Sequence, residues 1–325
     1  MTHDSFSISA DVVKKFEVQN NAKIIFLKAG DAGEALNKAI LSKNNPLADV
    51  FYGVDNTFLS RALKHNIFIS YTSPMLSEID DNLKLDPENR LLPVDFGDVC
   101  LNYDKKWFAQ RNIPPPTMLE DLVKPRYKGL LIIQNPATSS PGLAFLLTTI
   151  SRFGEFDSLD FWKKLKANDI LITSGWKEAY WGKFSAASDG DRPIVVSYAS
   201  SPAAEVHFAD KKLDDAHLDD AHLDDAPTAA VTDNGSAFRQ IEFAGILKGS
   251  KNMELARKLM DFLLSRTFQE DIPLQMFMFP ANKNASLPEV FEKHAVITPE
   301  PASLAPEEIS GKRELWIENW TELML

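Results

Sequence analysis

The stretch that decides the fold is "KGLLIIQNPATSSPGLAFLLTTISRFG", residues 128–154. Its apolar run "LLII" has the length of a buried strand, and the apolar residues after "SSPG" recur at helical spacing. The polar loop "QNPATSSPG" between them contains the proline and glycine residues typical of a turn. The stretch therefore predicts a strand, a polar loop and a helix in succession.

The same unit recurs elsewhere along the chain. "AKIIFLKAGDAGEALNKAIL" (22–41) predicts a short buried strand, "AKIIFL", then a glycine-containing loop and a helix. "ADVFYGVDN" (48–56) predicts a strand followed by a helix over 57–66, and "PIVVSYASSPAAEV" (193–206) predicts another strand and helix. Because strands alternate with helices, we expect an α/β fold built on a parallel sheet, with ligands bound by loops at the carboxyl ends of the strands.

Two long extended segments, near 91–103 and 238–247, interrupt these units. They are candidate crossings between two lobes, and a cleft between lobes is where small ligands prefer to bind. We expect a discontinuous lobe I (1–93 and 243–285) and a lobe II (94–242). The rest, 286–325, reads as a helical segment that the sequence assigns to neither lobe.

Further helices are predicted after three prolines, over 117–123, and in "NMELARKLMDFLLS", over 252–265. The last predicted helix begins near Pro306 and carries Trp316, Trp320 and Leu323 on one stripe.

Composition restricts the kinds of partner. The 325 residues include 35 Lys and Arg against 46 Asp and Glu, a net charge of −11. Since phosphate binding needs a basic surface, this charge argues against nucleic acid as a partner and is compatible with a cationic ligand. Cys100 is the single cysteine, so no internal disulfide forms, and no apolar run approaches the ~20 residues of a membrane helix. The N-terminus has no apolar signal segment, which taken at face value indicates a cytoplasmic protein. If the chain is a processed product, its location stays open.

An acidic repeat, "LDDAHLDDAHLDDAP", occupies residues 213–227. Aspartate and histidine at short spacing are possible metal ligands. We favour a solvated insertion in lobe II instead, because flexible carboxylates without a scaffold bind metals weakly. Deleting the repeat is expected to leave stability and ligand affinity nearly unchanged.

The aromatic stretch "GWKEAYWGKF" (175–184) allows two interpretations. In a helix, Trp176 and Tyr180 share one face and Phe184 continues it, which is typical of a core stripe. The same rings can instead form a wall on which a flat or cationic ligand stacks. Spacing alone leaves both interpretations open.

Motifs for catalysis are weak. The sequence contains no glycine-rich phosphate loop of known spacing, and no HExxH, GxSxG or CxxC motif. Cys100 is the one candidate nucleophile, but it lies in a predicted strand, where a free cysteine is usually a small buried hydrophobe.

Seven stretches, taken together and in order, resemble one family. They are "HDSF" (3–6), "ADVFYGVDN" (48–56), "PVDFGDVCLNYDKK" (93–106), "QNPATSSPGLAFLL" (134–147), "TSGWKEAY" (173–180), "VVSYASSPA" (195–203) and "DIPLQMFMFPAN" (271–282). They are similar to the periplasmic thiamine-binding proteins of ABC importers, a branch of the type II binding proteins that also includes ferric-ion binders.

The resemblance implies a two-lobed type II periplasmic binding protein fold whose lobes close on one ligand without chemistry. It implies thiamine or a thiamine phosphate as the ligand, an ABC transporter permease as the partner, and a monomer outside the cytoplasm with no cofactor or bound metal. The family also has a signal peptide and a first strand before "DSF", so we expect the natural product to carry both ahead of the given start.

The resemblance also implies ligand-binding residues, position by position. In order along the chain, they are the acidic residue Asp31 in a glycine-containing loop and the polar pair Asp55 and Asn56 after the next strand. They continue with the hydroxyls of Thr138 and Ser139 in the "NPATSSPG" loop. The aromatic members are the stacking Trp176, Tyr198 of "SY" and the late Phe277. Tyr180 and His3 complete the set. We expect Trp176 to stand outside the core, and Tyr180, Trp181 and Phe184 to serve mainly packing.

Three positions depart from the family pattern. His3 stands where a tyrosine is usual, Ala204 where another tyrosine is common, and Phe277 where a tryptophan is expected. Two rival functions follow from the same fold. One is a ferric-ion binder, for which Tyr198 is a single tyrosine where a pair is typical. The other is a thiamine-degrading transferase using Cys100 with Asp98, which lie two apart and so on one face of a strand.

Overall fold

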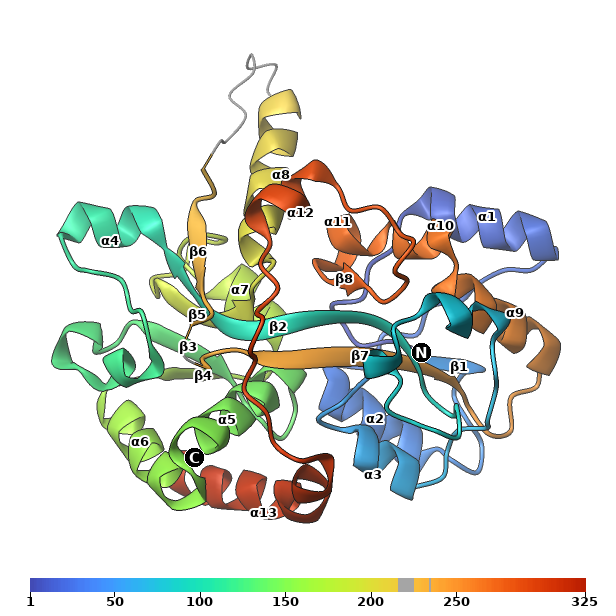
Figure 1. Cartoon of the computed structure of the whole chain (residues 1–325), viewed down its shortest axis with the longest axis horizontal. Helices are drawn as coiled ribbons and strands as arrows, with labels where there is room; N and C mark the ends of the chain where they lie inside the picture. Colours follow the sequence, from blue (N-terminus) through green and yellow to red (C-terminus); the bar gives the residue numbers. More distant parts are fainter. Residues whose placement is uncertain (216–224, 234) are drawn as a thin grey trace. The chain divides into compact units, whose positions relative to one another are not determined.

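A computed structural model describes residues 1–215, 225–233 and 235–325 (Figure 1). Most of the acidic repeat 213–227 lies outside these ranges, and the predictions about it stay predictions. The chain forms two compact units. Unit 1 consists of Met1–Phe96 and Gln240–Pro288, and unit 2 of Gly97–Arg239 and Glu289–Leu325.

The chain changes unit inside two strands. The boundary at 96/97 falls within β2 (Leu92–Asp104), and the boundary at 239/240 falls within β7 (Phe238–Ile246). Both lie in the extended segments predicted as crossings. A third change, at 288/289, precedes α12 (Glu289–His294), where the sequence predicted no crossing. The C-terminal residues from Glu289 onward group with unit 2.

Unit 1 combines paired strands with a set of helices. β1 (Val50–Asp55) pairs antiparallel with β7, and β8 (Phe279–Pro280) pairs antiparallel with the beginning of β2. Its helices are α1 (Ala10–Asn20), α2 (Ala32–Leu41), α3 (Leu59–Lys64), the 3₁₀ turns η1 (Pro74–Glu78) and η2 (Asp81–Leu83), α9 (Met253–Leu264), α10 (Arg266–Gln269) and α11 (Ile272–Met276).

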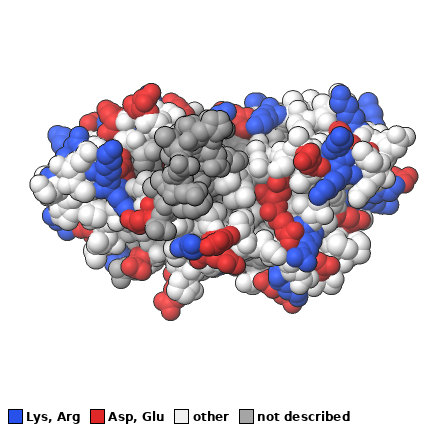
Figure 2. All heavy atoms as spheres, turned by 90° about the horizontal axis from the view of Figure 1, so that it is seen from above, with Lys and Arg blue, Asp and Glu red and all other residues white. Residues whose placement is uncertain are grey.

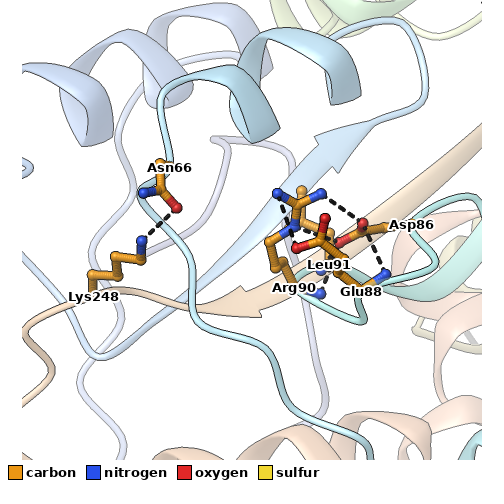
Figure 3. A network of polar contacts seen from close by, with 6 residues as sticks. All are labelled: Asn66, Asp86, Glu88, Arg90, Leu91 and Lys248. Carbon is orange, nitrogen blue, oxygen red and sulfur yellow. Dashed lines mark hydrogen bonds and ion pairs between the residues drawn. The ribbon is translucent and has the colours of Figure 1, made fainter.

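The loop that leads into β2 is held by a buried carboxylate. Asp86 accepts hydrogen bonds from the backbone N–H groups of Glu88, Arg90 and Leu91 and from the Arg90 guanidinium (Figure 3). Burial opposes ionisation of Asp86, but these hydrogen bonds hold its pKa below the usual value. Figure 3 also draws a separate contact, in which Lys248 donates to the side chain of Asn66. The contacts of Asp86 fix the entry of the chain into the first crossing strand.

Unit 2 is built on a mixed sheet. β3 (Leu131–Gln134) pairs parallel with β4 (Leu171–Thr173) and with β5 (Ile194–Tyr198), while β2 pairs antiparallel with β5 and β6 (Thr228–Val231). Its helices are α4 (Lys105–Arg111), the 3₁₀ turns η3 (Leu119–Val123) and η4 (Pro125–Tyr127), α5 (Ser140–Phe153), α6 (Glu155–Ala167), α7 (Trp176–Gly182), α8 (Ser201–Asp215), α12 and α13 (Pro306–Met324). The α/β class is confirmed, whereas a purely parallel sheet is not.

Helices cover this sheet with large buried rings. Trp162 of α6 is buried, and its ring meets the ring of Trp320 in α13 edge to face at 5.6 Å. Phe145 of α5 contacts the same ring of Trp162. The predicted stripe of α13 is thus a packing face, with Trp316 and Trp320 buried and Leu323 partly so.

Two predicted elements differ from the structure. The strand "AKIIFL" does not form: residues 22–27 belong to no strand, and the side chains of Ile25, Phe26 and Leu27 are 83%, 41% and 38% exposed. The helix predicted over 117–123 is only the 3₁₀ turn η3. Lys124, which precedes Pro125, is extended with ψ 142°, because a proline disfavours the helical region for the residue before it.

Among the described residues, no helix combines the length and apolar character needed to cross a membrane. Figure 2 draws one face of the molecule, on which Lys and Arg side chains lie next to Asp and Glu side chains.

Candidate functional site

In unit 2, Trp176 is the first residue of α7 and lies beside the end of β5. Its indole Nε1 donates to Ser197 Oγ at 2.9 Å, and Ser197 Oγ is 2.8 Å from Ser201 Oγ. Its ring stacks on Tyr180 at a centroid distance of 4.9 Å and lies 6.4 Å from the ring of Tyr198. The structure therefore brings the rings of Trp176, Tyr180 and Tyr198 together.

The burial of this aromatic group corrects one expectation. Trp176 is only 9% exposed and packs in a core cluster with Ile132, Tyr180 and Phe184, so the prediction that it stands outside the core is wrong. Stacking one turn along α7 and the bond to Ser197 together cover much of the indole. Tyr180 and Phe184 are buried, which confirms their packing role, whereas Trp181 is 36% exposed. Tyr198 is partly exposed.

Tyr180 also has a polar partner. Its hydroxyl donates to Glu205 Oε1 of α8 at 2.7 Å. Burial, together with the charge of Glu205, raises the pKa of Tyr180 well above its ordinary value. Tyr180 is thus a neutral hydrogen-bond donor that links the aromatic group to Glu205 of α8.

The loop between β3 and α5 places two hydroxyls at a helix N-terminus. Ser139 is the N-cap residue of α5, and its Oγ is buried with no hydrogen-bond partner among the described residues. Thr138 Oγ1 donates to the carbonyl of Ser174 at 2.6 Å, which ties this loop to the one before α7. Gly142 allows helix α5 to pack closely on β3. A Cβ at this position would lie 2.4 Å from the Gln134 carbonyl oxygen. The loop thus offers an unused hydroxyl beside N–H groups of the first helical turn.

In unit 1, Asp55 and Asn56 follow β1 as predicted, but their polar atoms already have local partners. Asp55 Oδ1 accepts from the backbone N–H of Thr57 at 2.6 Å, and Asn56 Oδ1 accepts from the backbone N–H of Ile241 at 3.0 Å. Asp55 is fully buried, and burial raises its pKa to about 7. Asp31 is the N-cap of α2, where its side chain accepts from the N–H of Ala32.

His3 belongs to a buried polar cluster that the sequence did not reveal. We call it the acid cluster, and its members are His3, Tyr52, Asp55, Asp95 and Glu242. His3 Nε2 lies 3.5 Å from Glu242 Oε2, the Tyr52 hydroxyl donates to Asp95, and Asp55 pairs with Glu242 across β1 and β7. His3 also requires Gly53, since a Cβ there would lie 2.5 Å from His3 Cδ2.

The acid cluster has strongly perturbed ionisation. Burial, with the charge of Glu242, raises the pKa of Asp95 well above its ordinary value. Burial alone would lower the pKa of His3, but Glu242 raises it above normal. Asp95 and Glu242 lie within extended apolar runs, and charged residues in a buried strand were the available sign of such a cluster.

The acid cluster is expected to make the protein less stable as pH rises from about 4 to about 7. Folded Asp55 keeps its proton up to about pH 7, whereas unfolded aspartate loses it near ~3.9. In this window the folded state binds more protons, so its unfolding free energy falls as pH rises. The loss attributable to Asp55 is roughly 4 kcal/mol at most, for a shift of about three pKa units.

Urea unfolding of the wild type and Asp55→Asn at pH 4.5 and 7.5 tests this expectation. The amide oxygen of the variant still accepts from Thr57, so its stability should change less between the two pH values. Asp80→Asn, which alters an exposed carboxylate, is the matched control and should behave as wild type. An identical pH dependence in wild type and Asp55→Asn would show that Asp55 does not retain its proton.

Phe277, the late aromatic residue, has an unusual backbone. It caps α11 with φ 58° and ψ 30°, the left-handed region that bulky side chains seldom adopt, and its ring is largely buried. Backbone strain of this kind costs roughly 1–2 kcal/mol and often marks functional loops.

The rival nucleophile is poorly placed. Cys100 is fully buried, and burial raises the pKa of its thiol well above the ordinary value. Asp98 forms an ion pair with Arg239 and accepts from the backbone N–H of Thr298 at 2.6 Å. Asp98, the carboxylate that the transferase alternative pairs with Cys100, therefore already has charged and hydrogen-bonding partners.

Comparison with known proteins shows which proteins the chain is similar to. Residues 45–303 match the family model described as bacterial extracellular solute-binding protein. The chain is 32% identical to the thiamine-binding periplasmic protein of Escherichia coli strain K12, over 98% of this chain and 90% of that protein. It superposes on a solved periplasmic thiamin binding protein with a TM-score of 0.84 and 30% identity, covering 100% of this chain and 95% of that one. A ferric binding protein from Campylobacter jejuni gives a TM-score of 0.75 at 18% identity, covering 99% and 98%, which is a likeness of fold alone.

Proposed function

The chain belongs to the bacterial extracellular solute-binding protein family, and from this premise we propose that its solute is thiamine or a thiamine phosphate. The observation that carries the proposal is end-to-end similarity to proteins named for thiamine binding, at 32% identity over 98% of the chain. The ferric relative has only 18% identity and gives no comparable support for iron.

Unit 2 supplies the aromatic and hydroxyl part of the proposed site. Thiamine has a flat aminopyrimidine, a cationic thiazolium and a hydroxyethyl tail, which is phosphorylated in its esters. We assign stacking on the ligand to Trp176 and Tyr198, while Tyr180 stacks on Trp176 and holds its ring in place. Each good ring contact contributes roughly 0.5–2 kcal/mol. The unpartnered hydroxyl of Ser139, with Thr138 fixing its loop, suits the hydroxyl or phosphate end of the ligand.

The remaining residues of the predicted ligand-binding set belong to unit 1. Asp31 is partly exposed at its helix N-terminus, and we assign it to the thiazolium charge or to the amino group of the pyrimidine. Asp55, Asn56 and His3 are held by contacts within unit 1, so we assign them a supporting electrostatic role. Phe277 is the aromatic that we assign to the ligand from this unit, in place of the expected tryptophan.

The proposal includes a partner and a location. Captured thiamine would pass to the membrane permease of an ABC importer, with the protein acting as a monomer outside the cytoplasm. We propose no chemistry on the ligand. The Cys100 thiol is buried and has a raised pKa, which opposes a nucleophilic role.

A thermal-unfolding panel tests the choice of solute. A ligand that binds only the folded state raises stability by RT ln(1 + [L]/Kd), about 2.7 kcal/mol at a hundredfold excess over Kd. Thiamine, its mono- and diphosphate, and ferric citrate are compared at equal concentration. Stabilisation by thiamine or a phosphate ester, and not by ferric citrate, supports the proposal. Stabilisation by ferric citrate alone would replace it with the iron-binding alternative.

A further inference from the structure

The part of β2 that belongs to unit 2 carries a buried asparagine, Asn102. It pairs with Val195 of β5 on one side and with Ala230 of β6 on the other (Figure 1). Its side chain is fully buried. Asparagine is disfavoured in strands, and burying an amide costs free energy unless its polar atoms are hydrogen-bonded. The fold alone would be served at least as well by an apolar residue at this position.

The amide of Asn102 is only half used. Its Nδ2 donates to the backbone carbonyl of Tyr198 at 3.0 Å and lies 3.8 Å from Cys100 Sγ, a weak acceptor. Its Oδ1 is buried and has no hydrogen-bond partner among the described residues. Because a carbonyl accepts only from a donor, the nitrogen is the atom that faces Tyr198. The strong hydrogen bond of this buried amide is thus directed at a residue of the proposed ligand site.

Tyr198 is the last residue of β5, and side chains hold its backbone on both sides. Its N–H donates to Ser201 Oγ at 3.3 Å, while its carbonyl accepts from Asn102. Ser201 Oγ lies 2.8 Å from Ser197 Oγ, which accepts from the indole of Trp176. The two serines therefore connect Tyr198 to Trp176, and Asn102 fixes the carbonyl end of Tyr198.

We propose that Asn102 is a positioning residue for the aromatic part of the ligand site. Its bond to the Tyr198 carbonyl fixes the peptide that follows Tyr198, and so the direction in which this partly exposed ring points beside Trp176. Asn102 is itself buried, so it acts through Tyr198 and not by touching the ligand. The inference rests on the proposed function, in which these two rings stack on thiamine, and it adds a residue outside the predicted ligand-binding set.

Asn102→Val tests the proposal against a matched control, Asn168→Val. Asn168 is also a buried asparagine of unit 2, and its Nδ2 donates to the carbonyls of Leu122 at 2.7 Å and Lys124 at 3.1 Å. These acceptors lie at the 3₁₀ turns η3 and η4, and not in β5 or α7. Both variants replace an amide by an apolar side chain of similar size, so they differ in which part of the backbone they release.

The two variants are expected to separate affinity from stability. Asn102→Val should weaken thiamine binding roughly fivefold or more, because the hydrogen bond no longer holds Tyr198. Its melting temperature without ligand should stay within about 3 °C of wild type, since valine is favoured in strands and the unpartnered Oδ1 is removed. Asn168→Val should unfold roughly 4 °C or more below wild type, because two carbonyls lose their donor, and should keep wild-type affinity. Asn102→Ala, which also removes the amide, should show the same loss of affinity as Asn102→Val.

A double-mutant cycle shows whether the effect passes through Tyr198. In a Tyr198→Ala background the ring is absent, so Asn102→Val should cause no further loss of affinity. Equal thiamine affinity in wild type and Asn102→Val, or losses that add in the double variant, would overturn the inference while leaving the proposed function intact. A wild-type protein that does not bind thiamine would instead contradict the proposed function, and the inference with it.

Discussion

Replacing Arg239 with alanine is expected to destabilise the protein by roughly 3–5 kcal/mol, because it leaves the Asp98 carboxylate buried without its cation. Asp98 is 2% exposed, and the guanidinium bonds to both of its oxygens as well as to the Thr298 carbonyl at 2.9 Å. Asp98 lies just after the change of unit at 96/97, and Arg239 lies just before the change at 239/240. Thr298 lies in the C-terminal part of unit 2, which begins at Glu289. The ion pair therefore ties together segments far apart along the chain.

Denaturant unfolding measures this effect against two further variants. Arg266→Ala removes an exposed pair with Glu270 and should cost less than about 1 kcal/mol. The double variant Arg239→Ala with Asp98→Asn should be more stable than Arg239→Ala alone, since no unpaired charge remains. Equal costs for Arg239→Ala and Arg266→Ala would contradict the account of Asp98 as a buried, dependent charge.

Replacing Trp176 with alanine is expected to weaken thiamine binding by roughly 1–3 kcal/mol, through loss of ring stacking and apolar contact. Because the indole is buried, stacked on Tyr180 and bonded to Ser197, the same change should lower the unfolding free energy by roughly 3–5 kcal/mol. Trp176→Phe retains a ring and should recover part of both losses.

The control for this prediction lies on the same helix. Trp181 is 36% exposed, and its ring meets those of Trp176, Tyr180 and Phe208 edge to face. Because Trp176 keeps its stacking on Tyr180 and its bond to Ser197 without this ring, Trp181→Ala should leave thiamine affinity unchanged. Quenching of tryptophan fluorescence by thiamine gives the affinities. Wild-type affinity in folded Trp176→Phe and Trp176→Ala would assign the indole to packing alone.

The local α/β units were predictable because each carries its own signal. The runs that became β1, β3 and β5 are short, apolar and followed by turn residues and a periodic helix. The segment 22–27 has the same composition, yet it forms no strand, because strand formation depends on a neighbour that composition does not specify. The region after the three prolines likewise failed as a helix when Pro125 restricted Lys124.

The candidate site was predictable to a different degree in each unit. Trp176 and Tyr198 lie at the ends of elements that the sequence delimits, so their proximity could be expected. For the acid cluster the only sequence signal was the charge of Asp95 and Glu242 within buried strands. Its membership could not be predicted, because Tyr52, Asp95 and Glu242 are far apart in sequence and meet only when β1, β2 and β7 are assembled. The burial of Trp176 was also missed, since it depends on Ser197 and Tyr180 covering the indole together.

Isothermal titration calorimetry with thiamine tests the central claim most directly. The account predicts saturable binding of one thiamine per chain, weakened in Trp176→Phe and unchanged in Trp181→Ala. The absence of heat and of saturation for thiamine and both of its phosphates, with a protein that unfolds cooperatively, would contradict it.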